Sequence, residues 1–292
     1  MLSDAERIML HWLAREIPLP AGAVIVDAGA FLGGSTLALA TGLRKRTKDF
    51  RNEYRIHSYD MFVAPNDPYS LELIGHNRKP GDSVLDLYVS ALGELKSSTV
   101  IHAGDLMAAP APGAPTALQF IDVAKTRALN AKIVIEFFPL LIPDKSIVVQ
   151  QDYNDHSCPW INATMEYLHE YFDFLCDMRG SRVFRNTRAI PLAALRDAAY
   201  GLSLSDELDL VLRGAARGGQ DDTARFISAV SGGWSVFERD GVDAALSFLD
   251  NLPYRQTWEG ESYVDFVKTA MKGLGDKSSL DRYHRGYFRD FP

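Results

Sequence analysis

The chain has 292 residues, 47% of them hydrophobic and 24% charged, so it can bury a core without disulfides or metal clips. Its formal net charge of −7 disfavours a nucleic-acid-binding surface, and no apolar run reaches the roughly 18 residues of a membrane span. Its two cysteines, Cys158 and Cys176, have neither metal-clip nor disulfide-framework spacing. Reduced thiols and an N-terminus without a signal-peptide pattern predict a cytoplasmic protein that binds neither nucleic acid nor membrane.

The first predicted element is a helix that begins after Ser3. Glu6 follows three residues later, and this pair matches a capping box, in which side chain and backbone satisfy each other. Met9, Leu13 and Ile17 are spaced four apart and give the helix one apolar face. The prolines that follow end it.

Four aspartates come at or near the ends of apolar segments. The predicted strands are residues 23–26, 55–59, 99–102, 117–121 and 147–151, and helical patterns lie between them at 35–43, 83–95 and 128–138. This alternation predicts a Rossmann-like, doubly wound α/β fold with a mostly parallel sheet flanked by helices. Ligands bind beyond the carboxyl ends of such strands, so we expect Asp27, Asp60, Asp122 and Asp152 to share one edge.

From about residue 192 the pattern becomes entirely helical. Helices are predicted at 192–202, 206–217, 221–230, 236–252 and 262–274, separated by Gly, Ser or Pro. The chain therefore divides into a domain of residues 1–190 and a C-terminal α-helical domain of residues 191–292. Packing, lid formation and homodimer formation all remain open as its role. The basic and aromatic stretch 282–289 is expected to dock as a tail rather than to bind nucleic acid.

The strongest motif is VIVDAGAFLGGST at residues 24–36. Gly29 allows a sharp turn after the strand and lets the backbone approach a ligand with no Cβ in the way. Gly33 and Gly34 allow close packing where the next helix begins. The D-x-G-x-x-x-G spacing differs from the G-x-G-x-x-G dinucleotide fingerprint, and no Gly-Lys-Ser/Thr follows as in a P-loop.

This motif resembles the first motif of class I S-adenosylmethionine-dependent methyltransferases. The variant is that of the metal-dependent small-molecule O-methyltransferases, such as catechol and macrocin O-methyltransferases, and the resemblance covers roughly residues 20 to 160. In that family the glycine turn wraps the methionine part of the cofactor. The residues that the resemblance places against the cofactor in this turn are Asp27, Gly29, Ala30, Phe31, Gly33 and Ser35.

The resemblance also implies the other cofactor contacts. An acidic residue that ends the second strand binds the ribose hydroxyls in the family, and Asp60 matches its place. The chemistry agrees, because a carboxylate can accept both hydrogen bonds of a vicinal diol. Gly104 and Asp105 fall where such folds fix the adenine.

In the metal-dependent relatives, acidic residues at the ends of the fourth and fifth strands hold a divalent cation, and a nearby lysine serves as base. Asp122 and Lys125 match the fourth-strand acid and the lysine, and Asp122 also borders the cofactor site. The acidic pair of the fifth strand corresponds to Gln151 and Asp152, so its first member is an amide, with Asp155 as a further ligand candidate. The resemblance thus implies Mg²⁺, which prefers oxygen ligands and lowers the pKa of a bound hydroxyl.

Several alternatives stay open around this edge. His156 is a candidate either for the metal site or as general base, because imidazole titrates near neutral pH. Asp122 and Asp152 have a second interpretation, as caps of strand ends without a metal. Trp160 fits a substrate pocket or the packed start of a helix, and residues 61–98 fit a lid or an additional helix.

Three functions follow from these residues. The preferred one is an S-adenosylmethionine-dependent methyltransferase that methylates a hydroxyl of a small molecule, of sugar or natural-product type, with Mg²⁺ assisting. An oxidoreductase that uses a dinucleotide is the second, and the missing G-x-G-x-x-G counts against it. The third is a non-catalytic module of the same fold that binds a partner through its C-terminal helices.

Overall fold

The computed structural model describes residues 2–46, 55–75, 77–153, 155–217, 222–252 and 260–274. The strands in this part of the chain are β1 (Val24–Ala28), β2 (Ile56–Asp60), β3 (Thr99–Ala103), β4 (Thr116–Ile121), β5 (Ile147–Gln150), β6 (Phe172–Met178) and β7 (Ser181–Asn186). They form one seven-stranded sheet in the order β3-β2-β1-β4-β5-β7-β6, in which β7 alone runs in the direction opposite to the other six. The doubly wound, mostly parallel α/β fold predicted from the sequence is confirmed.

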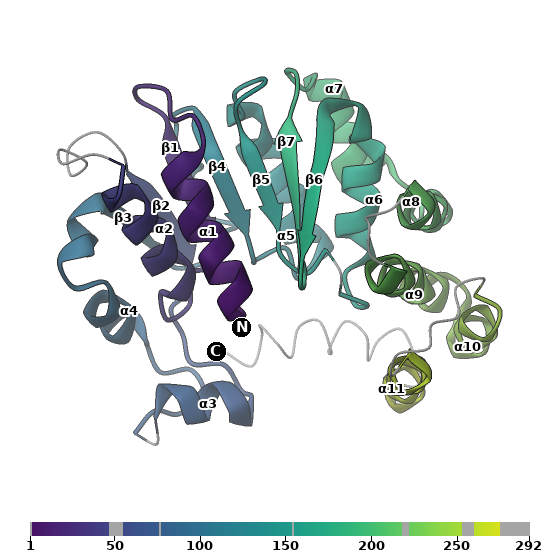
Figure 1. Ribbon diagram of the computed structural model, residues 1–292. Helices are drawn as coiled ribbons and strands as arrows, with labels where there is room; N and C mark the ends of the chain where they lie inside the picture. The colour runs from purple at the N-terminus through teal and green to yellow at the C-terminus, as the bar shows by residue number, and fades with distance from the viewer. Residues whose placement is uncertain are drawn as a thin grey trace.

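Helices cover both faces of the sheet (Figure 1). Those of residues 2–201 are α1 (Asp4–Glu16), α2 (Gly34–Arg44), α3 (Pro68–Ile74), α4 (Leu85–Leu92), α5 (Arg127–Lys132), α6 (Pro159–Tyr167) and α7 (Leu192–Arg196). Short 3-10 or π turns extend them at η2 (Gly93–Ser98), η3 (Ile133–Phe137), η4 (Phe138–Leu140), η5 (His169–Tyr171) and η6 (Asp197–Gly201). Apolar side chains of α1 and α2 pack on one face, and those of η3, α6 and α7 pack on the other.

The strand pair β6 and β7 was not predicted. The sequence pattern suggests one helix over 161–171 with Phe172 on its apolar side, but α6 ends at Tyr167 and Phe172 begins β6. The reason is that charged residues interrupt the apolar pattern by which the other strands were predicted. Arg182 of β7 pairs with Asp177 of β6 at 2.6 Å, and an ion pair of the same kind joins the two strands further along.

The first helix begins as its capping box predicts. The Ser3 hydroxyl accepts from the backbone N–H of Glu6, and the Glu6 carboxylate accepts from the backbone N–H of Ser3 at 2.9 Å. The same carboxylate is buried and accepts at 2.8 Å from the hydroxyl of Ser181, at the start of β7. One glutamate therefore both starts α1 and fastens it to the distal half of the sheet.

The C-terminal helices are α8 (Leu204–Arg217), α9 (Asp222–Asp240), α10 (Val242–Asp250) and α11 (Gly260–Leu274). They enclose an apolar cluster of their own, whereas Leu195 and Ala198, which also lie beyond residue 190, pack into the core of the sheet. The domain division at residue 190 stays a prediction. The predicted docking stretch 282–289 lies outside the described residues. No helix of the described residues is long and apolar enough to cross a membrane.

The predicted helix break between residues 230 and 236 is wrong, because α9 runs through this stretch and stops only before Gly241. The glycines there serve packing instead of interruption. A Cβ on Gly232 would lie 2.8 Å from Leu208 of α8, and one on Gly233 would lie 3.0 Å from Leu249 of α10. Small residues thus let α9 pack closely between its two neighbours.

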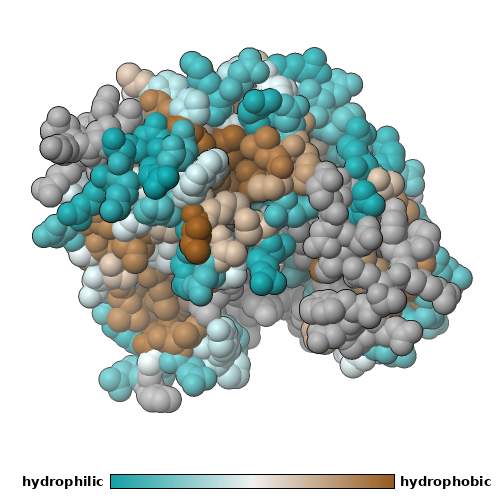
Figure 2. All heavy atoms as spheres, viewed as in Figure 1, coloured by the Kyte–Doolittle hydropathy of each residue, from teal (hydrophilic) through white to brown (hydrophobic). Residues whose placement is uncertain are grey.

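Hydrophobic side chains remain visible at two places on the face shown in Figure 2, beside α1 over the sheet and around α4. The large hydrophobic residues exposed on α1 are Ile8 and Trp12, at 69% and 53% of their surface. They are one helical turn apart and point away from the buried stripe of Met9 and Leu13. Single exposed apolar side chains are common on soluble proteins and need no special role.

Gly42 tests the tight crossing of α1 and α2. A Cβ at this position would overlap the carbonyl group of His11 and come within 3.0 Å of the Ala14 Cβ, so the helices would have to separate. We expect Gly42→Ala to lower the free energy of unfolding by about 2–3 kcal/mol, as overpacking does. Gly34→Ala, on the same helix with nothing within 4 Å, should leave it unchanged or slightly higher. Urea denaturation checks both, and equal effects of the two substitutions would contradict the crossing.

Candidate functional site

The turn after β1 lies in direct contact with the end of β4. Gly29 has a φ of 98° and donates its N–H to the carbonyl of Tyr59 at 2.8 Å, while Asp122 donates to the carbonyl of Ala28 at 2.7 Å. A Cβ on Gly29 would lie 2.5 Å from the carbonyl oxygen of Asp122. β2 and β3 lie on one side of β1 in the sheet, and β4 and β5 lie on the other. The strand order therefore reverses between β1 and β4, and ligands bind at such switch points.

Asp60, at the end of β2, holds the glycine turn in place. Its carboxylate accepts from the backbone N–H groups of Phe31 at 2.9 Å and Phe62 at 2.6 Å. Both phenylalanines have positive φ, 44° and 51°, which is costly for an L-residue unless the surroundings hold it. Burial raises the pKa of Asp60, although the two backbone hydrogen bonds oppose this. The structure therefore brings Gly29 and Asp60 to the same edge, as the sequence predicts.

Asp27 lies beneath this turn, within β1. It is fully buried and accepts from the hydroxyls of Ser35 at 3.0 Å and Thr36, both on the same carboxylate oxygen. Its other oxygen, Oδ1, has no hydrogen-bond partner among the described residues. Burial raises the pKa of Asp27 to about 7, against the effect of the two hydroxyls. The sequence pattern did not reveal Thr36, because one threonine in a helix start carries no distinctive signal.

The loop after β3 lies beside Asp60. Gly104 donates its N–H to the Asp60 carbonyl at 2.9 Å, and its φ of 127° requires glycine. Asp105 is exposed, and its side chain accepts from the N–H of Met107 at 2.9 Å, which closes the turn. Met61 and Met107, in the loops after β2 and β3, leave 41% and 46% of their surface exposed. The loops after β2 and β3 thus each carry an exposed, flexible apolar side chain, and the backbone of the second loop is bonded to Asp60.

These groups fit S-adenosylmethionine. The start of α2 has a glycine N-cap, Gly33, and no side-chain cap, so its first backbone N–H groups face the turn as a partial positive charge suited to a carboxylate. Asp60 offers the carboxylate that a ribose diol needs, with lone pairs beyond those used by the two backbone N–H groups. Asp27, which is fully buried below the turn, stays a predicted cofactor contact.

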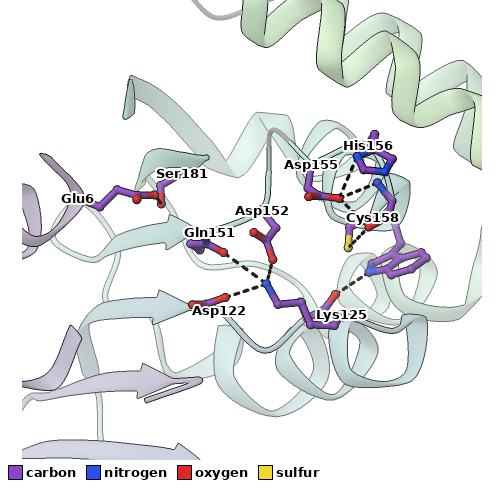
Figure 3. Close-up of polar contacts among 12 residues, drawn as sticks. Glu6, Asp122, Lys125, Gln151, Asp152, Asp155, His156, Cys158 and Ser181 are labelled. Carbon is purple, nitrogen blue, oxygen red and sulfur yellow. Dashed lines mark hydrogen bonds and ion pairs between the residues drawn. The ribbon is translucent and has the colours of Figure 1, made fainter. Parts of the chain in front are cut away.

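A second group of side chains surrounds the ammonium of Lys125 (Figure 3). Its Nζ lies 2.8 Å from Oδ1 of Asp122 and 3.4 Å from Oε1 of Gln151, and it also pairs with Oδ2 of Asp152. Asp152 has a φ of 61°, in the left-handed region that aspartate tolerates better than most residues. Burial lowers the pKa of Lys125, but Asp122 and other neighbouring groups outweigh it, so that pKa is raised and the lysine is charged.

The predicted Mg²⁺ ligands therefore do not fit a free divalent cation. The oxygens of Asp122, Gln151 and Asp152 converge, as a metal site would require, but they converge on an ammonium. Asp155 does not join them, because its Oδ1 accepts from the N–H and hydroxyl of Ser157. No group of three or more His, Cys, Asp or Glu side chains suited to a metal occurs in the described part of the chain.

His156 lies apart from this group. Figure 3 shows its ring beside Asp155 and away from Lys125, and its Nδ1 lies 3.8 Å from the Asp155 carboxylate. The ring centroid is 6.0 Å from that of Trp234 on α9 and 5.7 Å from that of Phe266 on α11. Burial lowers the pKa of His156, with Asp155 opposing, so the imidazole is neutral near pH 7. Its assignment as a base stays a prediction.

Two side chains fix the loop that carries Lys125. Trp160 is buried and donates its indole N–H to the carbonyl of Ala124 at 2.7 Å, so it packs the start of α6. Arg127 lies with its guanidinium 5.0 Å from the Trp160 ring centroid and pairs with Glu207 of α8 and, at 3.1 Å, with Glu238 of α9. The role of Arg127 could not be predicted from the sequence, because its partners come 80 or more positions later.

The buried Asp27 predicts how stability changes with pH. Its pKa in the fold, about 7, exceeds the unfolded value of 3.8, so the folded protein favours the protonated acid and loses stability as pH rises between these values. Relative to Asp27→Asn, which does not titrate, wild type should lose up to about 4 kcal/mol between pH 4 and pH 7 and little more above pH 8. Denaturation at several pH values measures this difference. The exposed Asp144→Asn is the control, and a constant Asp27→Asn difference would refute the assignment.

No protein-family model and no curated protein matches the sequence. Solved structures similar to this chain include the O-methyltransferase NovP, 12% identical with a TM-score of 0.48 over 63% of this chain and 80% of that one. The calicheamicin methyltransferase CalS11 is 14% identical with a TM-score of 0.43 over 62% and 77%. The O-methyltransferase from Bacillus cereus is 13% identical with a TM-score of 0.39 over 64% and 83%.

Likenesses of this degree do not establish an activity, and the fold rests on the sheet itself. The strand order reverses at β1, and the glycine turn and Asp60 meet at the carboxyl edge where the order reverses. The chain therefore has the doubly wound, mostly parallel α/β fold that its alternating strands and helices predict.

Proposed function

We propose that the protein is an S-adenosylmethionine-dependent methyltransferase that methylates a hydroxyl group of a small molecule. The observation that carries the proposal is the hydrogen bond between the N–H of Phe31 and the Asp60 carboxylate, 2.9 Å long. It fastens the glycine turn, suited to the methionine part of the cofactor, to the carboxylate suited to its ribose. An adenosyl sulfonium is a ligand that needs both groups at one edge.

The loops after β2 and β3 support the adenosine end of this assignment. Met61 and Met107 offer exposed thioether side chains that can pack on a planar ring, and methionine adapts readily to such surfaces. One carboxylate oxygen of Asp105 accepts from the N–H of Met107, so this side chain shapes the loop after β3. These contacts suit an uncharged aromatic ring, and they complement the polar contacts at Asp60.

The acceptor end is assigned to Asp122 and Asp152. Each uses one carboxylate oxygen on Lys125, and the second oxygen of each is the group we assign to the proton of an acceptor hydroxyl. When bound, the cofactor supplies a methyl group on a positively charged sulfur. Asp122 and Asp152 would orient the hydroxyl, and one of the two carboxylates would take up its proton as the oxygen–carbon bond forms and the sulfur–carbon bond breaks. Two carboxylates and one ammonium leave a net negative charge, which favours a neutral acceptor beside a positive sulfonium.

Cofactor binding is the first test. Asp60→Asn keeps the size of the side chain but removes acceptor capacity, so we expect affinity for S-adenosylmethionine to fall by about 1–3 kcal/mol, roughly 5- to 150-fold. Isothermal titration calorimetry measures it. Asp206→Asn is the matched control, because Asp206 also accepts from a backbone N–H, that of Ser203 in the C-terminal helices.

Thermal unfolding of both variants separates lost binding from lost folding. Wild-type protein that fails to bind S-adenosylmethionine at millimolar concentration would defeat the proposal. Equal binding by Asp60→Asn and wild type would defeat the assignment of Asp60.

Methyl transfer is the second test. A panel of hydroxyl-bearing small molecules, with amines for comparison, is incubated with the wild-type chain and a labelled methyl donor. With an acceptor found, Asp122→Asn should lower turnover by roughly 100-fold or more, the contribution of a positioned proton acceptor, and change cofactor affinity less than about threefold. Asp144→Asn, an exposed aspartate before β5, is the control. Transfer to amines alone would remove the hydroxyl assignment.

A further inference from the structure

The group around Lys125 has the composition of a cation site that is already filled. An ammonium carries three N–H donors, and three oxygens surround this one, from Asp122, Gln151 and Asp152. The oxygens come from two adjacent strand ends, after β4 and after β5, and the cation comes from the loop between β4 and α5. Donors and acceptors match in number, and Figure 3 shows the side chains of all three accepting residues pointing at Nζ.

The same oxygens are those a divalent cation would use. Carboxylate and amide oxygens are ligands of Mg²⁺ and Mn²⁺, and a metal here would have to lie among Asp122, Gln151 and Asp152. The ammonium of Lys125 holds that position, and two cations cannot share it without strong repulsion. To admit a metal, the lysine would have to give up three contacts together.

We propose that Lys125 is a built-in cation that takes the place of a divalent metal at this edge. The wild-type protein then has no divalent-cation site among these residues, and removing the ammonium creates one. The inference goes beyond methyl transfer, because it concerns only which cation balances Asp122 and Asp152. The inference rests on the convergence of three oxygens on the Lys125 nitrogen, and it does not depend on which cofactor or acceptor the protein binds.

Mn²⁺ binding to the full chain without cofactor or acceptor tests the inference. Free Mn²⁺ is followed by electron paramagnetic resonance during titration of wild type and Lys125→Ala, and Mg²⁺ then competes. We expect Lys125→Ala to bind one Mn²⁺ at least tenfold more tightly than wild type. The double variant Lys125→Ala/Asp152→Asn should lose most of that gain, because one charged ligand is gone.

Lys132→Ala is the matched control. Lys132 is a largely buried lysine whose Nζ pairs with Glu136 at 2.7 Å and with no second carboxylate among the residues that the structure describes. Its removal should leave Mn²⁺ binding as in wild type. Wild-type binding as tight as that of Lys125→Ala would overturn the inference, and so would a folded Lys125→Ala that binds no better. If Lys125→Ala does not fold, the titration of the wild-type protein decides. Sub-millimolar Mn²⁺ binding by wild type would refute the inference if Mg²⁺ displaces the Mn²⁺ and Asp152→Asn abolishes the binding.

Discussion

The contact between the turn after β1 and the end of β4 governs the rest of this structure. Asp122 donates its N–H to the carbonyl of Ala28. A Cβ at position 29 would lie only 2.5 Å from the carbonyl oxygen of Asp122, and Gly29 has none. Only glycine permits this approach with a φ of 98°. Because the turn is held so low against β4, the carboxylates of Asp60 and Asp122 end at one edge. A molecule bound at the ends of β1 and β2 can therefore contact a molecule bound at the ends of β4 and β5.

The parts of the fold that the sequence predicted are those dominated by buried apolar strands. The segments of β1, β4 and β5 are mostly apolar and fully buried because both faces of the sheet are covered, and such runs stand out in a sequence. The pair β6 and β7 escaped because its charged residues are neutralised across the strands, as Arg182 is by Asp177. The glycines of α9 led to the wrong prediction of a helix break, because their role also depends on contacts with other elements. They look like a break, and only the closeness of Leu208 and Leu249 shows why a helix keeps them.

The site divides along the same line. Gly29 and Asp60 could be predicted, because backbone geometry and strand ends fix their places and both signals are local. The partners of Lys125 could not, because a side chain three residues past Asp122 can point outward as a free base or inward as a counter-ion. Its direction depends on Gln151 and Asp152, which arrive from another strand. The amide at 151 was visible as a departure from the family pattern, but its connection to Lys125 was not.

A lysine holds a fixed cation position only if the backbone on either side of it is fixed, because its long side chain has many rotamers to lose on ordering. Here Trp160 anchors the carbonyl just before Lys125, and Arg127, two residues after it, is anchored by Glu207 and Glu238. Those glutamates belong to α8 and α9, and neither contributes to the carboxyl edge itself. An ion pair of this kind, buried at the glutamates and half-exposed at Arg127, adds little net stability but favours one arrangement of the loop. The ion pairs of Arg127 with α8 and α9 thus help to hold in place the loop that carries Lys125.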